Sequence, residues 1–225
     1  MNRSERAIEL VHTFFEDAQT RPILDLGCGY GETETLLLAD GFNDLTCLEY
    51  DASTIEKTRD AFKGSDIRFV QEPGEHMSFV DESFDLVLSL DVLEHVQSDA
   101  EVVGEIARVL KSEGIFVGSV PYRGVSFLLD PENILSLLKR KKPVHHHYTI
   151  RELTVLLDPH FENVTFERRG MGLSQLVFLS TYILRPFLKE TVMRLQKKVS
   201  HWEFARQFGF LSYHVVFTGR LRQRD

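Results

Sequence analysis

The stretch ILDLGCGYGE, residues 23–32, limits the fold more than any other part of this 225-residue sequence. It begins as a short apolar run of strand length and continues into three alternating glycines, Gly27, Gly29 and Gly31, before a helical pattern starts at Glu32. Glycines allow a sharp turn and let the backbone approach a ligand without an intervening side chain. A strand, a glycine turn and a helix in this order are typical of α/β proteins that bind a dinucleotide or a nucleoside.

Apolar runs of strand length alternate with helical patterns along the chain. Strands are expected at 23–26, 45–49, 67–70, 84–90, 115–120, 164–169 and 213–218. Helices are expected at 4–15, 32–39, 53–62 and 99–110, the last of them closed by Gly114. The alternation predicts a doubly wound, mostly parallel seven-stranded Rossmann-like sheet with helices on both faces.

The length and the hydrophobic content of 43% suit one domain over residues 1–225 with a full core. The alternation loosens at about 122–160 and 170–211, where we expect two insertions that form a helical cap. Ligands of open parallel sheets bind beyond the carboxyl ends of the strands. The insertions are therefore expected to carry substrate specificity.

Charge and cysteine content exclude some classes of function. The formal net charge of −8 offers no broad positive field for a phosphate backbone, so no nucleic-acid partner is expected. Two cysteines, Cys28 and Cys47, with no secretory leader ahead of them, predict reduced thiols in the cytoplasm. No metal site is expected, because adjacent residues of the histidine triplet 145–147 would point to opposite sides of an extended chain.

Two segments of the expected cap carry unusual patterns. Residues 171–188 approach the length of a membrane span but contain Ser, Gln, Thr and Arg, which is more typical of an interfacial helix. The basic run LKRKK at 138–142 is typical of a solvated helix end and, less often, of a phosphate contact. Together they leave three alternatives: peripheral membrane contact with a lipid-linked acceptor, a cover over the pocket, or a homodimer interface.

A carboxylate, Glu49, ends the second predicted strand twenty residues after Gly29, where it can accept hydrogen bonds from both hydroxyls of an adenosine ribose. A pyrophosphate favours a helix N-terminus without competing anions. Here Asp25, Glu32 and Glu34 surround the turn, and the spacing is Gly-x-Gly-x-Gly instead of Gly-x-Gly-x-x-Gly. The residues therefore favour a cationic ligand with sulfonium and ammonium groups over a nicotinamide dinucleotide.

Four successive segments, ILDLGCGYGE, LEYDASTIEKTR, VDESFDLVLSLDVLEHV and LKSEGIFVGSVP, resemble the motifs of class I S-adenosylmethionine-dependent methyltransferases of the small-molecule type. The order and spacing match over about residues 20–121. The resemblance implies S-adenosyl-L-methionine as the cofactor, and its binding residues are expected to be Asp25, Gly27, Cys28, Gly29, Gly31, Glu49, Tyr50, Gly74, Glu75, Leu90 and Asp91. Pro73 stands where the family usually has an aspartate for the adenine amino group, so backbone groups or Glu75 are expected to replace it.

Histidines are the candidates for a general base. The resemblance places a histidine near the substrate just before a helix such as YTIRELTVLLDP, which favours His147 and then His146. His95, in LSLDVLEHV, is a third candidate, although His95 and Glu94 can equally well decorate a helix start. A neutral imidazole can take a proton from a hydroxyl as the methyl arrives. A merely solvated triplet is the alternative.

The sequence thus predicts transfer of a methyl group to a small-molecule or lipid-linked acceptor, most readily to oxygen, by in-line displacement. No Asn-Pro-Pro-Tyr motif, which amino-methylating nucleic-acid enzymes of the family often carry, follows the fourth predicted strand. One alternative is a catalytically silent S-adenosylmethionine-binding module, which would bind the cofactor without turnover. Another is an NAD(P)-dependent oxidoreductase, which the acidic helix start and the lack of a convincing Tyr-x-x-x-Lys pair disfavour.

Overall fold

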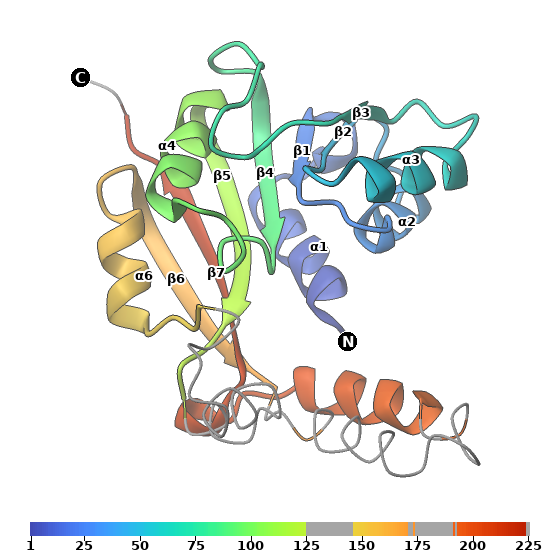
Figure 1. Ribbon diagram of the computed structural model, residues 1–225. Coiled ribbons are helices and arrows are strands. Elements are labelled where there is room, and N and C mark those ends of the chain that lie inside the picture. The colour runs from blue at the N-terminus through green and yellow to red at the C-terminus, as the bar shows by residue number, and fades with distance from the viewer. Residues whose placement is uncertain (125–145, 171–172, 174–190, 192, 224–225) are drawn as a thin grey trace.

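The computed structural model describes residues 1–124, 146–170, 173, 191 and 193–223 (Figure 1). Seven strands form one sheet in the order β3-β2-β1-β4-β5-β7-β6. They are β1 Ile23–Leu26, β2 Leu45–Leu48, β3 Arg68–Val70, β4 Phe84–Leu90, β5 Leu110–Pro121, β6 Phe161–Arg169 and β7 His214–Leu221. The first five strands are parallel, and β7 runs antiparallel between β5 and β6. The predicted mostly parallel, seven-stranded sheet is confirmed.

Helices cover both faces of the sheet, as predicted (Figure 1). They are α1 Arg3–Phe14, α2 Glu32–Ala39, α3 Ala52–Ala61, α4 Asp99–Val109 and α6 Ile150–Leu157, with short 3-10 turns η1 Ala18–Thr20 and η3 Gly209–Leu211. Buried residues of α1 and α2 pack with Ile23, whereas those of α4 and α6 pack with Leu24. Successive residues of a strand point to opposite faces, so β1, β2, β4, β5 and β7 each contribute to both cores.

The first turn of α1 is fixed by a capping box. The Oδ1 atom of Asn2 accepts a hydrogen bond from the Glu5 backbone N–H at 2.8 Å, and Glu5 Oε2 accepts one from the Asn2 backbone N–H at 2.7 Å. These bonds satisfy two of the donors that a helix N-terminus leaves free. With the helix start fixed in this way, Arg3, the first residue of α1, lies close to the last residues of β4 and the first residue of β7.

The expected end of the fourth helix differs from the structure. Helix α4 ends at Val109, and Leu110 is already extended and pairs with Phe84. The register then shifts, and the next pair is Leu86 with Ile115, so the residues between Leu110 and Ile115 bulge out of β5. Gly114 lies in this bulge and does not end the helix. A Cβ at this position would lie 2.8 Å from the Lys111 carbonyl oxygen, so the bulge needs a glycine here.

The expected insertions fall only partly within the described residues. Helix α6 and the residues between β5 and α6 that are described belong to the first, and residues 193–204, which are helical, belong to the second. The basic run 138–142 and, apart from Leu173, the segment 171–188 lie outside the described residues. The cap and the single domain therefore stay predictions. None of the described helices is long and apolar enough to cross a membrane.

Candidate active site

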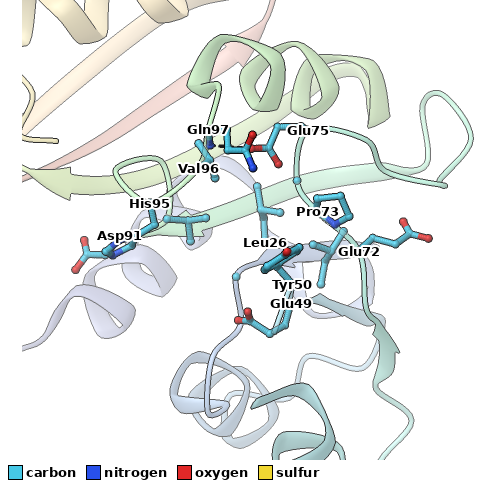
Figure 2. Close-up of a pocket in the computed structure, with 14 residues that line it drawn as sticks. Leu26, Glu49, Tyr50, Glu72, Pro73, Glu75, Asp91, His95, Val96 and Gln97 are labelled. Carbon is cyan, nitrogen blue, oxygen red and sulfur yellow. Dashed lines mark hydrogen bonds between the residues drawn. The ribbon is translucent and has the colours of Figure 1, made fainter. Parts of the chain in front are cut away.

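A cavity of about 410 Å³ lies at the carboxyl ends of β1, β2 and β4 (Figure 2). Strand β1 has β2 on one side and β4 on the other, so this is the switch point at which open α/β sheets bind ligands. Six of the predicted cofactor-binding residues line the cavity: Gly27, Glu49, Tyr50, Gly74, Glu75 and Asp91. The volume suits a ligand of nucleoside size.

The first glycine of the turn, Gly27, lines this cavity, and close packing at both ends of the turn leaves no room for side chains there. Gly27 and Gly31 both have a φ of +79°, in the left-handed region that favours glycine. A Cβ on Gly27 would lie 2.4 Å from Val92 Cγ2, and one on Gly31 would lie 2.2 Å from the Phe62 ring. At Gly29, by contrast, the nearest atom to an added Cβ is 4.0 Å away. The turn is thus closely packed at its two ends and open at its middle residue.

Glu49 connects the turn to the end of β2. Its Oε2 atom accepts a hydrogen bond from the Gly29 backbone N–H at 3.1 Å, and its Oε1 atom accepts one from the Asp51 backbone N–H at 3.0 Å. Each carboxylate oxygen keeps a second lone pair that can accept another hydrogen bond. Glu49 therefore orients the turn and still has acceptor capacity facing the cavity, which fits a ribose diol.

The opposite end of the cavity lies after β3. Glu75 Oε1 accepts a hydrogen bond from the Gln97 backbone N–H at 2.9 Å, and Figure 2 shows Pro73 and Val96 near this pair. The ring of Tyr50 lies at the rim and is 73% exposed. Pro73, Gly74 and Val96 give this end apolar and backbone surface beside the polar side chains of Glu72, Glu75 and Gln97, which is compatible with a flat base that has polar edges. Adenine binding by Glu75 or by backbone groups stays a prediction.

The other predicted cofactor-binding residues, Asp25, Cys28, Gly29, Gly31 and Leu90, do not line the cavity. Asp25 is buried beneath the turn, and burial, together with the charge of the buried Glu34, raises the pKa of its carboxyl well above the usual range. Two of the three carboxylates that we expected around the ligand thus lie in the interior, and Glu32 is the exposed one. This corrects the charge argument, because Asp25 and Glu34 do not present a negative surface to the ligand.

A buried cluster surrounds Asp25. The Cys47 thiol donates a hydrogen bond to Glu34 Oε1 at 3.1 Å, and Cys28 lies beside it. The nearby Cys28 thiol and burial both raise the pKa of Cys47, so it is a thiol and not a thiolate at neutral pH. A protonated group avoids the free-energy cost of burying a charge. The cluster therefore forms a polar core on which the glycine turn packs.

Asp91 directly follows β4 and carries a carboxylate that forms an ion pair. It has a φ of 57° and accepts hydrogen bonds at Oδ1 from Ser119 Oγ at 2.7 Å. Its Oδ2 atom forms an ion pair with Arg3 and lies 3.4 Å from His214 Nε2. Burial would raise the pKa of Asp91, but the charges of His214 and Arg3 and these hydrogen bonds lower it, so the carboxylate is ionised at neutral pH.

Glu94 differs from Asp91 although it lies three residues away. Its side chain is buried, and Oε2 has no hydrogen-bond partner within the described part of the chain. Burial and the negative charge of Asp91 raise its pKa to about 9. Glu94 is therefore protonated at neutral pH, and two neighbouring carboxyl groups have opposite protonation states.

The three histidines predicted as bases lie in different places. His95 lines the cavity, with its side chain about half exposed (Figure 2). His147 is buried, and its ring centroid is 6.1 Å from that of Tyr213. His146 is exposed and its ring contacts Tyr148 edge-on, with 4.3 Å between centroids. A catalytic role for any of the three stays a prediction.

Sequence reasoning missed Arg3 and His214. Both contact Asp91, but Arg3 comes from the first helix and His214 from the last strand, more than 100 residues from Asp91 in the second case. Their position depends on β7 running antiparallel to β5, which pairs His214 with Pro121 at the carboxyl end of β5. To find this histidine from the sequence, one would have had to predict that the last strand runs antiparallel to β5.

The fold is that of an α/β protein with an open, mostly parallel sheet. Its cavity lies at the switch point, where proteins of this class bind nucleoside ligands. The sequence model of the family described as "Methyltransferase domain" matches residues 24–118. A probable S-adenosylmethionine-dependent methyltransferase of Mycolicibacterium smegmatis is 31% identical over 160 residues, or 69% of this chain and 58% of that protein. The chain belongs to the class I S-adenosylmethionine-dependent methyltransferases. The predicted family and its cofactor, S-adenosylmethionine, are confirmed.

Two further comparisons set the limits of this assignment. The ubiquinone biosynthesis O-methyltransferase of Rickettsia canadensis is 32% identical over 51% of this chain and 49% of its own length. The crystal structure of the [4+2]-cyclase SpnF has a TM-score of 0.69 at 17% identity and covers 96% of this chain and 80% of that one, which shows the shared fold alone. This chain spans about half of the length of the curated relatives that it matches.

Proposed function

We propose that this protein transfers a methyl group from S-adenosylmethionine to a hydroxyl oxygen of a small-molecule acceptor. The observation that carries the proposal is the cavity at the switch point, where the glycine turn, Glu49 and Asp91 meet. Relatives named as ubiquinone biosynthesis O-methyltransferases, about 30% identical over half of the chain, support oxygen as the accepting atom.

The residues present fit the cofactor. Gly27 lines the cavity without a side chain, so a ligand can approach the backbone there, and Glu49 retains lone pairs for two ribose hydroxyls. Asp91 also lines the cavity, and in Figure 2 its ionised carboxylate points away from the other labelled residues, toward its partners Arg3 and His214. When bound, S-adenosylmethionine supplies an electrophilic methyl group on a sulfonium centre.

The protein's own contribution to this reaction is positioning and the handling of one proton. Transfer of a methyl group to a held oxygen gains most of its rate from alignment and from exclusion of water. A hydroxyl acceptor must also lose its proton, and a neutral imidazole is a sufficient acceptor for it. The protonated Glu94 cannot act as this base at neutral pH because its pKa is about 9.

A catalytically silent binding module is the second candidate. The fold alone does not decide between the two, because a [4+2]-cyclase shares it. An oxidoreductase has no support from the family match, which is to methyltransferases. Cytoplasmic location, peripheral membrane contact through 171–188, a lipid-linked acceptor and a homodimer stay proposals.

Calorimetric titration of the purified chain with S-adenosylhomocysteine and, separately, with NADH tests the cofactor. Micromolar binding of S-adenosylhomocysteine alone is expected. Formation of S-adenosylhomocysteine from S-adenosylmethionine in the presence of hydroxylated compounds then tests turnover. Binding without turnover on any acceptor would favour the silent module, and binding of NADH alone would overturn the proposal.

A further inference from the structure

Gly29, the middle glycine of the turn, is held by hydrogen bonds on both of its backbone groups. Its N–H donates to Glu49 Oε2 at 3.1 Å, and its carbonyl oxygen accepts a hydrogen bond from Thr58 Oγ1 at 2.6 Å. Glu49 directly follows β2 and Thr58 lies in α3, so two different elements hold one residue. Together the two bonds fix the peptide groups on either side of a glycine whose φ is +52°.

These hydrogen bonds form a closed circuit with the start of α3. Glu49 Oε1 accepts a hydrogen bond from the Asp51 N–H at 3.0 Å. Asp51 is the N-cap of α3, and its Oδ1 accepts one from the Thr54 N–H at 2.8 Å. Thr58 lies about one helical turn after Thr54 and returns to Gly29. The N-cap sets where α3 begins, and it therefore also sets which residue of the helix faces the glycine turn.

Thr58 is polar but buried, on a helix whose other buried residue is Ile55. It is 1% exposed, and its methyl carbon would lie 3.1 Å from a Cβ built on Gly31, so it also packs against the end of the turn. Its hydroxyl has one proton and two neighbouring acceptors, the carbonyl oxygens of Gly29 at 2.6 Å and of Thr54 at 3.0 Å. The shorter distance assigns the proton to the bond with Gly29.

We infer that Thr58 is a positioning residue for the cofactor, whose hydroxyl holds Gly29 so that the turn and Glu49 keep the arrangement that binds S-adenosylmethionine. Gly27 and Glu49 line the cavity, whereas Gly29 and Thr58 do not, so Thr58 acts through the turn. Glycine has the most backbone freedom of all residues, and an unheld Gly29 has to be ordered when the cofactor binds. That ordering reduces the affinity. The inference concerns the cofactor and does not depend on which atom accepts the methyl group.

Two substitutions separate the hydrogen bond of Thr58 from its packing. Thr58→Val keeps the branched shape and removes the hydroxyl, whereas Thr58→Ser keeps the hydroxyl and removes the methyl group that packs against Gly31. The whole chain is titrated with S-adenosylhomocysteine by calorimetry. The affinity of Thr58→Val should be about tenfold lower than that of wild type, and Thr58→Ser should stay within about threefold of wild type. If Thr58→Val does not fold, Thr58→Ala, which also lacks the hydroxyl, takes its place.

Thr218→Val is the matched control. Thr218, in β7, is 2% exposed, and its hydroxyl forms a hydrogen bond with Thr165 Oγ1 at 2.8 Å, but it does not line the cofactor cavity. This variant also removes a buried, hydrogen-bonded hydroxyl, and its affinity for S-adenosylhomocysteine should equal that of wild type. Thermal unfolding of each variant measures the loss of stability that such a removal causes by itself.

A double-mutant cycle with Glu49→Ala tests whether Thr58 acts through Gly29. Both side chains hold this glycine, so the turn is already loosened in Glu49→Ala, and adding Thr58→Val should lower the affinity by a further factor of less than about three. Hydrogen exchange of the Gly29 amide, followed by NMR, gives a second readout. It should be about tenfold faster in Thr58→Val than in wild type and unchanged in Thr218→Val, because only the first variant frees the turn.

Three results would overturn the inference while leaving the proposed function intact. The first is an affinity of Thr58→Val within about twofold of wild type. The second is an equal loss in Thr58→Ser, which would assign the effect to packing. The third is the same fold-loss from Thr58→Val in wild type and in Glu49→Ala, which would mean that Thr58 does not act through Gly29.

The proposed function fails in a different way. No binding of S-adenosylhomocysteine by the wild-type chain would overturn the proposed function and the inference together. The expected losses in Thr58→Val, combined with no turnover on any hydroxylated compound, would support the inference and favour the silent binding module over the methyl transfer.

Discussion

The two halves of the site are built in different ways. The cofactor half comes from contiguous motifs, in which a strand, its following turn and the end of the next strand supply Gly27 and Glu49 within 23 residues. The half around Asp91 combines the first residues of α1, the end of β4 and the start of β7, which are brought together only by the folded sheet. Local sequence therefore determines the first half, and the topology determines the second.

The largest effect is expected at Gly27. Gly27→Ala places a Cβ 2.4 Å from Val92 at a positive φ, so the turn must move, and S-adenosylhomocysteine affinity should fall by at least about 100-fold. Gly64→Ala is the matched control, because Gly64 has a φ of 90° but no atom within 4 Å of an added Cβ. Calorimetry measures both variants. Equal affinities of the two would mean that the turn does not hold the cofactor.

Glu49 should give the next largest effect. Glu49→Ala removes a carboxylate that accepts from Gly29 and Asp51 and is expected to pair with the ribose, so affinity for S-adenosylhomocysteine should fall by about 2 kcal/mol. Glu49→Gln keeps one acceptor oxygen and should lie between that variant and wild type. Glu56→Ala, an exposed glutamate on α3, is the control. Unchanged affinity in Glu49→Ala would remove the ribose assignment.

Glu94 gives a stability effect that depends on pH. Its folded pKa of about 9 lies above the usual 4.5, so between these values the unfolded chain releases a proton that the folded protein keeps. The free energy of unfolding from this group is therefore highest below about pH 4.5 and falls as pH rises toward 9. Glu94→Gln has no such proton and should be more stable than wild type at pH 8 by several kcal/mol, because each pH unit between 4.5 and 8 costs the wild type about 1.4 kcal/mol.

Thermal unfolding at a series of pH values checks this prediction. The difference between Glu94→Gln and wild type should close as the pH approaches 4.5, where both side chains are uncharged. Glu101→Gln, an exposed glutamate in the first turn of α4, serves as the comparison and should show little change. A difference that stays constant with pH would show that Glu94 is ionised in the folded protein.

The difference between the halves also explains what could be predicted from the sequence. The existence of strands β1 to β5, their parallel arrangement, the glycine turn and Glu49 follow from local patterns, and the structure places Gly27 and Glu49 in one cavity. The burial of Asp25, in β1, and of Glu34, in α2, was not predictable, because carboxylates are rarely fully buried and the sequence gives no sign that these two lie together in the interior. The approach of His214 to Asp91 depends on the antiparallel β7 and leaves no local signal.

The smallest effect is expected at His95. It lines the cofactor cavity, but its side chain is 52% exposed, and its ring Nε2 lies 3.9 Å from Oε1 of the buried Glu94, which is protonated at neutral pH and offers no negative charge. His95→Asn should therefore change both the affinity for S-adenosylhomocysteine and the rate of methyl transfer by less than about threefold. Calorimetry measures the affinity, and formation of S-adenosylhomocysteine from S-adenosylmethionine measures the rate. A large loss of rate with unchanged affinity would instead make His95 the residue that accepts the proton of the acceptor hydroxyl, because binding would be intact and only the chemical step impaired.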